Sequence, residues 1–95
     1  MQITTSGNMA VITGNIKSVS DFQEIKNSLD MLKTNNSTII VEVKDSISIT
    51  SSVIGYLNKL VLKDKKTLQL KVGNPQLLEL LDDLNLVRVF NAKKV

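Results

Sequence analysis

Three consecutive hydroxyl residues, Thr50, Ser51 and Ser52, are the part of this sequence best suited to chemistry. They follow a β-branched apolar run that ends at Val43 and precede residues with the apolar spacing of a helix. A hydroxyl at a helix start accepts a hydrogen bond from a backbone N–H that has no partner in the helix, which stabilises by about 1 kcal/mol. One such cap accounts for one hydroxyl, and three in a row leave one or two unexplained.

Phosphorylation is the second role that this position suits. A phosphate on a serine at a helix N-terminus meets free N–H groups and the positive end of the helix dipole. The modification adds roughly two negative charges to the surface and changes the fold little. The residue types alone favour the capping role, and a phosphorylated, partner-reading surface is the alternative.

The composition excludes several classes of function. The chain has 95 residues, which suits a single domain over residues 1–95, and it contains neither Cys nor His. Disulfides, thiolate nucleophiles, histidine triads and the common zinc sites are therefore excluded. No run of about 18 apolar residues predicts a membrane span, and the polar N-terminal segment differs from a secretion signal. We expect a cytoplasmic protein with no metal and no cofactor.

Two further features point weakly to an enzyme or to a nucleic-acid binder. Asp82 and Asp83 are adjacent on a predicted helix, so their carboxylates diverge by about 100° and do not form an acid–base pair. The lysine-rich stretch from Lys59 to Lys71 lacks the stacking aromatics of a nucleic-acid surface, and Arg88 is the one arginine. With a net charge of +3, these lysines are expected to be solvated. We expect neither catalysis nor nucleic-acid binding.

The elements around the hydroxyl cluster follow from periodicity and turn residues. Ser6-Gly7-Asn8 predicts a hairpin turn, and Ser20 with Gln23 predicts a capping box. The nearly continuous apolar run Thr38–Val43 predicts a central strand covered on both faces. The elements predicted for this half are strands at 2–5 and 9–16, a helix from 20 to about 35, and a strand at 38–43.

The second half repeats an α–β pattern. Asn74-Pro75 predicts a helix start, and Asn85 is expected to take the left-handed conformation after that helix. The predicted elements are helices at about 51–63 and from 75, strands at 67–72 and 87–90, and a tail at 91–95 without regular structure. The order β-β-α-β-α-β-α-β predicts an α/β domain with a mixed four- to five-stranded sheet and amphipathic helices.

This order and several motifs resemble the STAS domain of bacterial anti-sigma-factor antagonists over residues 9 to 90. The stretch Thr50–Gly55 is similar to the family's Asp-Ser-Ser/Thr-Gly motif at a helix start. Gly14-Asn15-Ile16 is similar to the end of its second strand. Asn74–Leu77 and Asn85-Leu86 are similar to its third helix and the turn that follows. Four positions depart from the family pattern: Thr50 and Lys17 replace Asp, Asn15 replaces an acid, and Val53 replaces Gly.

The resemblance implies a regulatory protein–protein interaction module in a partner-switching system that controls transcription. It implies that a serine-kinase anti-sigma factor phosphorylates Ser52, with Ser51 as the second choice, and that a phosphatase reverses this. The unphosphorylated form then binds the kinase and frees the sigma factor. The alternative is a STAS subunit of a transport or signalling complex that docks without phosphorylation. We expect a monomer or weak dimer.

The expected docking surface combines the turn after the second strand, the loop before the hydroxyl cluster and the first turns of the helix. Its residues are Asn15, Ile16, Lys17, Ser48, Ile49, Thr50, Ser51, Ser52, Val53, Gly55 and Tyr56.

Overall fold

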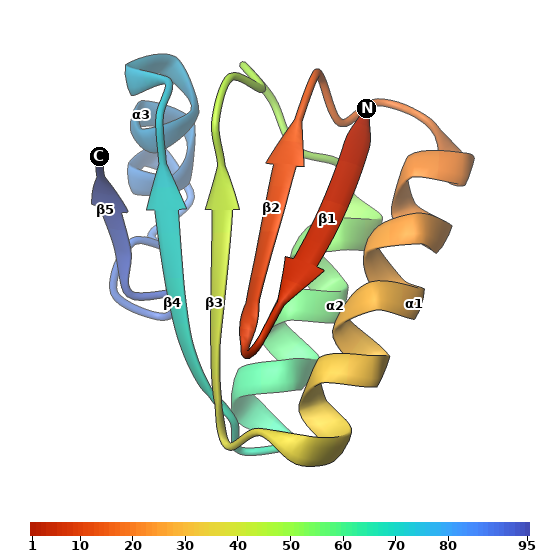
Figure 1. Ribbon diagram of the computed structural model, residues 1–95. Helices are drawn as coiled ribbons and strands as arrows, with labels where there is room; N and C mark the ends of the chain where they lie inside the picture. Colours follow the sequence, from red (N-terminus) through yellow and green to blue (C-terminus); the bar gives the residue numbers. More distant parts are fainter.

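A β-hairpin followed by three α–β units builds the fold, which a computed structural model describes for residues 1–95 (Figure 1). The predicted element order β-β-α-β-α-β-α-β is confirmed. The elements are β1 (Gln2–Ser6), β2 (Met9–Thr13), α1 (Val19–Asn35), β3 (Thr38–Val43), α2 (Ser51–Leu62), β4 (Thr67–Val72), α3 (Pro75–Asp83) and β5 (Ala92–Lys94).

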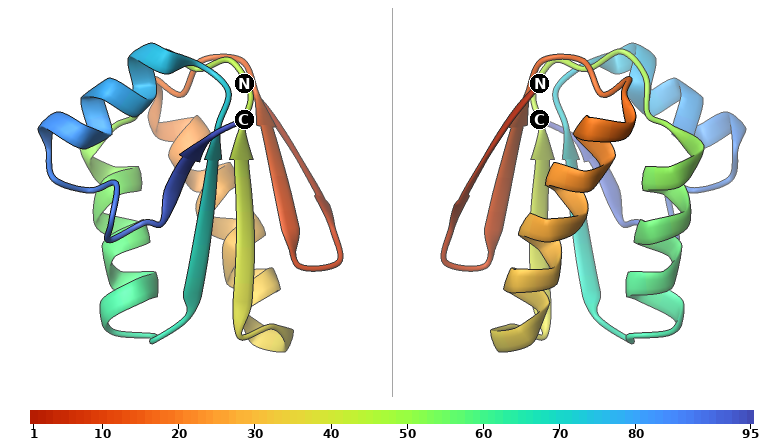
Figure 2. Two further views of the ribbon diagram at one scale, coloured as in Figure 1. Left: turned by 90° about the vertical axis from the view of Figure 1, so that its left-hand side faces the viewer. Right: turned by 90° about the vertical axis from the view of Figure 1, so that its right-hand side faces the viewer.

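The five strands form one mixed sheet in the order β1-β2-β3-β4-β5. The hairpin pairs β1 with β2 antiparallel, and the pairs β2–β3, β3–β4 and β4–β5 are parallel. Since each α–β unit adds its strand on the same side of the previous one, right-handed crossovers place every helix on the same face of the sheet. Figure 2 shows α1, α2 and α3 together on that face.

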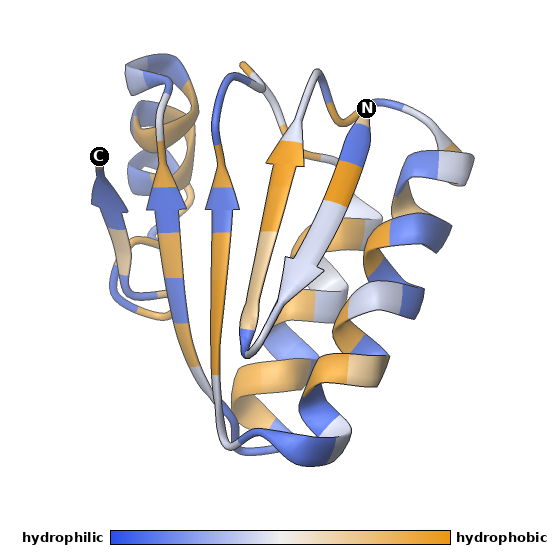
Figure 3. Cartoon of the chain, in the orientation of Figure 1, coloured by the Kyte–Doolittle hydropathy of each residue, from blue (hydrophilic) through white to orange (hydrophobic).

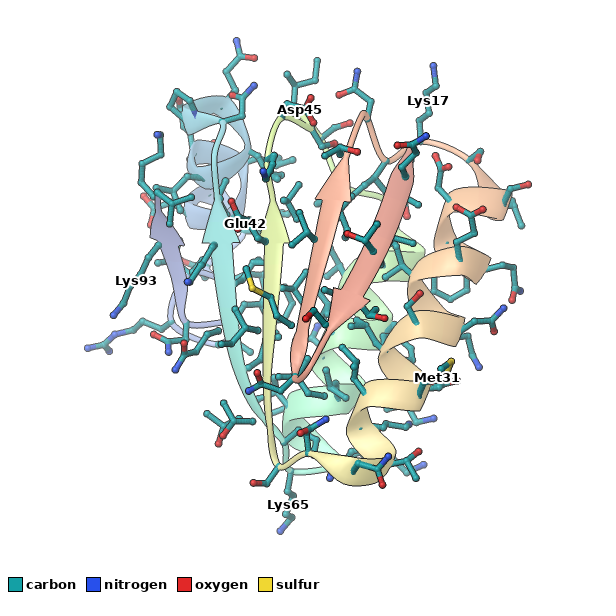
Figure 4. The ribbon with its side chains drawn as sticks, viewed as in Figure 1. Lys17, Met31, Glu42, Asp45, Lys65 and Lys93 are labelled. Carbon is teal, nitrogen blue, oxygen red and sulfur yellow. The ribbon has the colours of Figure 1, made fainter.

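The opposite face of the sheet has no helix over it, so the prediction that β3 is covered on both faces was wrong. Along β3, Ile39, Val41 and Val43 are buried beneath the helices, while Ile40 and Glu42 alternate with them and stay half-buried. Glu42 projects from this open face in Figure 4. The apolar run was misleading because Ile40 is a β-branched residue on a half-exposed surface, where strands also favour it.

Aliphatic side chains between the sheet and the helices form a single core cluster of 20 buried residues. Figure 3 shows apolar residues concentrated along β2, β3 and β4 and in α2. Phe90 and Tyr56 are the buried aromatic residues of this cluster. None of the three helices has the length and apolar character to cross a membrane.

The start of α1 lies two residues earlier than the sequence indicated. Ser18, not Ser20, is the N-cap: its hydroxyl accepts from the N–H of Asp21, and the Asp21 carboxylate accepts from the N–H of Ser18. The predicted box with Gln23 was wrong because a carboxylate three residues after a cap accepts stronger, charge-assisted hydrogen bonds than an amide. The strand before it also ends early, at Thr13, because Gly14 turns the chain with a φ of 83°.

The C-terminal segment differs most from the prediction. Residues 87–90, predicted as a strand, form a turn, and the tail predicted as irregular contains β5. Asn85 does take a left-handed φ of 59°, and a second left-handed residue, Asn91 at 50°, redirects the chain into the sheet. Between them the Phe90 N–H donates to the Leu86 carbonyl at 2.9 Å, and the Phe90 ring is fully buried. Phe90 therefore serves as a core anchor within a turn.

Candidate functional site

The hydroxyl cluster lies where β2 and β3 end and α1 and α2 begin, at the upper end of the molecule in Figure 1. Two loops meet there, residues 14–18 after β2 and residues 44–50 after β3. Figure 4 shows Lys17 and Asp45 at this end. The carboxyl ends of parallel strands are where α/β folds gather their functional loops.

Three hydrogen bonds join these two loops. The N–H of Gly14 donates to Asp45 Oδ1 at 2.7 Å, and the N–H of Ile47 donates to Asn15 Oδ1 at 3.1 Å. The N–H of Ile16 donates at 3.0 Å to the hydroxyl of Ser46. That hydroxyl donates in turn to the carbonyl of Ser48 at 2.7 Å. The loops are thereby held as one surface.

Ser46 is the one fully buried polar residue of the chain. Its hydroxyl both accepts and donates a hydrogen bond, so burial does not leave it without a partner. Sequence reasoning missed Ser46 and Asp45, although short polar residues directly after a strand are typical of turns. Their partners lie about 30 positions away in the chain, so pattern alone does not identify them.

Gly73, at the end of β4, allows the neighbouring loop to approach closely. Its N–H donates to the Val43 carbonyl at 2.8 Å, and a Cβ at this position would lie 2.1 Å from the carbonyl oxygen of Lys44. Real Cβ atoms do not approach that closely, so only glycine fits beside this backbone. The backbone at Val43 and Lys44, where the loop after β3 begins, is therefore held against the end of β4.

The start of α2 uses one of its three hydroxyls as a cap. Thr50 is the N-cap, in an extended conformation, and its hydroxyl accepts from the N–H of Val53 at 3.3 Å. The first turn of α2 contains no acidic residue. Ser51 and Ser52 occupy the first two helical positions, are exposed, and take no part in the cap.

A shallow groove of about 130 Å³ separates the starts of α1 and α2. Ser52 and Thr50 line it on one side. Lys17, Ser18, Val19 and Phe22 line the other. Pockets that enclose small-molecule ligands are typically about 300–1,000 Å³, so this groove suits contact with a macromolecule better than capture of a small substrate.

Electrostatics differ on the two sides of this groove. On the α1 side, the Asp21 carboxylate accepts from the N–H groups of Lys17 and Ser18 at 3.0 and 3.1 Å. These bonds, the one from Lys17 foremost, hold the pKa of Asp21 below its usual value. On the α2 side no carboxylate meets the helix start, so its positive dipole end faces the groove beside Ser52.

Most of the predicted docking residues lie on this surface. Exposed among them are Asn15, Lys17, Ser48, Ser51, Ser52 and Gly55. Ile49 and Thr50 are half-buried. Three predictions need correction: Ile16, Val53 and Tyr56 are only 1%, 2% and 7% exposed. Their side chains belong to the core because each points from its loop or helix toward the sheet, so they do not contribute contact surface.

Tyr56 instead joins α1 to α2 through a polar cluster. Its hydroxyl donates to Asp30, which also pairs with Lys26 at 3.0 Å and with Lys33 at 3.4 Å. Lys33 reaches Asp64 at 3.0 Å and lies 5.8 Å from the centre of the Tyr56 ring. Burial, reinforced by the Asp30 carboxylate, raises the pKa of the Tyr56 hydroxyl. Tyr56 therefore has a structural role in positioning α2.

No family model, curated protein or solved structure matches this chain. The geometry of the groove and of the joined loops is therefore the basis for a functional proposal.

Proposed function

We propose that this chain is a regulatory protein–protein interaction module of the STAS type. Its docking face consists of the exposed residues of loop 15–17, loop 47–50 and the first turns of α2 through Gly55. The single observation that carries the proposal is the exposed hydroxyl of Ser52 at the second position of α2, outside the cap that Thr50 provides. A position of this kind accepts a phosphate without loss of a structural hydrogen bond.

Phosphorylation of Ser52 would alter the docking face chiefly through charge. The phosphate would lie at a helix N-terminus that no acidic side chain neutralises, across the groove from Lys17. Roughly two negative charges would be added to a groove that Lys17 also lines. Like-charge repulsion against an acidic partner surface, or steric loss of close contact, then releases the partner.

The rest of the docking face suits a rigid contact. Its two loops are hydrogen-bonded to one another, and Gly55 leaves the surface of α2 bare one turn after Ser51. Nothing lies within 4 Å of the position that a Cβ on Gly55 would occupy, so the backbone there is open to a partner. By resemblance to anti-sigma-factor antagonists, we propose a serine-kinase anti-sigma factor or related regulator as that partner.

Capture of partners from an extract of the native host tests this proposal. The baits are the wild-type chain, Ser52→Asp, Ser52→Ala and the matched control Ser20→Asp. Ser20 is also exposed and also occupies the second position of its helix, α1. We expect Ser52→Asp to reduce the bound kinase-type partner at least about tenfold, which corresponds to about 1.4 kcal/mol. Ser52→Ala and Ser20→Asp should bind as the wild type does, and mass spectrometry should find phosphate on the Ser52 peptide.

Equal binding by Ser52→Asp and Ser52→Ala would refute control by phosphorylation. The second candidate function, a STAS subunit that docks without modification, would then be favoured by the cation that Lys17 places beside the groove. In that case Lys17→Glu should abolish capture, because the family's acidic residue is replaced here by a lysine on the docking face. Binding that survives both changes would place the partner elsewhere on the molecule.

A further inference from the structure

The two outer strands of the sheet differ in how they are protected against pairing with another strand. At one edge, β5 has three residues, of which Lys93 and Lys94 carry charge. Short length and lysines are common devices that keep an edge strand from pairing. At the other edge, β1 has five residues, Gln2–Ser6, with neither a charge nor a proline among them. It pairs with β2 residue for residue, without a bulge.

The hairpin turn determines which backbone groups of β1 face outward. Gly7, with a φ of 60°, is the first central residue of a two-residue turn, the position that needs a positive φ in a type II′ turn. Ser6 and Met9 flank this turn and are paired. The two residues that flank a two-residue turn form a hydrogen-bonded pair, and along an antiparallel ladder such pairs alternate with pairs that are not hydrogen-bonded. Ser6, Thr4 and Gln2 are therefore hydrogen-bonded to β2, whereas Thr5 and Ile3 are not. The backbone N–H and C=O of Ile3 and Thr5 therefore point away from β2, toward the free edge.

We propose that β1 pairs antiparallel with β1 of a second copy of this chain, about a two-fold axis at Thr4. In this register Ile3 of each copy exchanges two backbone hydrogen bonds with Thr5 of the other copy. Thr4 faces Thr4, and Gln2 faces Ser6, across the axis. The two five-stranded sheets then become one continuous sheet, in which a two-fold interface uses the same surface of both copies.

Two observations and one geometric consequence of the register favour a second copy over an unrelated strand. The pairing register is self-complementary, and the side chains that face each other on the open face of the sheet, Thr4 with Thr4 and Gln2 with Ser6, are hydroxyl and amide groups that hydrogen-bond across strands. The strand is neutral in a chain of net charge +3, so it is a region where two copies approach without repulsion between strands. The two-fold axis also sets α1 of one copy beside α1 of the other on the helical face.

The flank of α1 that would meet this second helix is incompletely covered in the single chain. An open cavity of about 590 Å³ lies between β1 and α1, lined in part by Met1, Ile3, Asn27 and Ser28. Met31, three residues beyond Ser28 and thus on the same flank, is 71% exposed. In Figure 4 it projects from α1 on the side of the molecule where β1 lies. Dimerisation would cover the apolar side chains Met1, Ile3 and Met31 on this mostly polar flank.

Sedimentation equilibrium of the full chain, with matched charge variants, tests the interface. Thr4 and Thr67 are both exposed threonines on the open face of the sheet, but β4 is an interior strand. We expect the wild type and the control Thr67→Lys to dimerise alike. Thr4→Lys and Thr4→Glu should each dimerise at least about tenfold more weakly, because like charges would face each other on the axis. An equimolar mixture of the two should recover the dimer as a mixed pair.

A wild type that stays monomeric at every accessible concentration would overturn the proposal. So would a dimer that Thr4→Lys leaves intact, since the contact would then lie elsewhere. Circular dichroism of each variant distinguishes loss of pairing from loss of fold. Failure of the mixed pair to form, with both variants monomeric and folded, would rule out the register centred on Thr4.

Discussion

The starts of α1 and α2 lie on opposite sides of one groove and are capped in different ways. Ser18 and Asp21 close the start of α1 with a reciprocal capping box, and the Asp21 carboxylate offsets the positive end of the helix dipole. The start of α2 has the hydroxyl of Thr50 as its cap and no acid in its first turn. Ser52 therefore lies at the helix start whose positive dipole end no acidic side chain offsets.

The difference separates the hydroxyls that cap a helix from the hydroxyls that take no part in a cap. The start of α1 has two hydroxyl residues, Ser18 and Ser20, and the start of α2 has three, yet only one hydroxyl in each accepts a backbone hydrogen bond as the cap. In α1 the remaining serine, Ser20, is next to Asp21, so an added negative charge meets repulsion there. In α2 the equivalent serine, Ser52, has no acidic neighbour in its turn. An identical residue at an equivalent position thus has a different capacity for phosphate.

The largest expected effect comes from breaking the link between the two helix starts. Ser46→Ala should lower the free energy of unfolding by about 1–3 kcal/mol, because it leaves the N–H of Ile16 buried without an acceptor. Urea denaturation measures the change. Ser48→Ala, an exposed position whose carbonyl rather than side chain is used, is the control and should unfold as the wild type does. Equal stability of all three proteins would show that Ser46 does not join the loops.

Removing the two helix caps should lower the free energy of unfolding by unequal amounts. Ser18→Ala is expected to cost about 1–2 kcal/mol and Thr50→Ala about 0.5–1 kcal/mol, because Ser18 belongs to a reciprocal box. The pKa of Asp21 is lowered in the folded state, so the contribution of that carboxylate is present above its ordinary value of 3.8 and is lost as the pH falls below it. Thermal unfolding at pH 7 measures the cost of each substitution, and thermal unfolding at acidic pH measures the loss of the Asp21 contribution. A larger loss for Thr50→Ala at pH 7 would contradict the comparison.

The smallest expected effect is an increase in the free energy of unfolding. Ser52→Asp should stabilise the fold by about 0.3–1 kcal/mol at low salt, since it supplies the negative charge that the start of α2 lacks. Ser20→Asp should give little or no gain, because Asp21 already occupies that helix start. Denaturant unfolding with and without added salt separates the two variants, and salt should diminish the gain. Equal gains from both substitutions would remove the distinction between the two helix starts.

Local sequence patterns predicted much of the fold and less of the site. Asn74-Pro75 did begin a helix and Asn85 did end one in the left-handed conformation, because those preferences reside in single residues. The open face of the sheet was not predicted, since it depends on the direction in which strands are added. The strand at 87–90 was misplaced because burial of Phe90 in a turn produces the same apolar pattern as a short strand.

The proposed docking face could be predicted from the sequence only as a set of neighbouring segments. Thr50 to Ser52 were placed correctly at a helix start. The bonds from Gly14 to Asp45 and from Ile47 to Asn15 join residues about 30 positions apart, and nothing in either segment alone specifies the other. Tyr56 was misassigned because its acidic acceptor, Asp30, comes from another helix.

The uncovered face of the sheet offers a position for site-specific chemical attachment. The chain has no cysteine of its own, so Thr67→Cys would introduce a unique thiol on that face. Thr67 begins β4, at the end of the sheet opposite the loops that follow β2 and β3. A dye or a sensor surface attached through this thiol would leave Ser52 pointing into solution, in one orientation for every immobilised molecule.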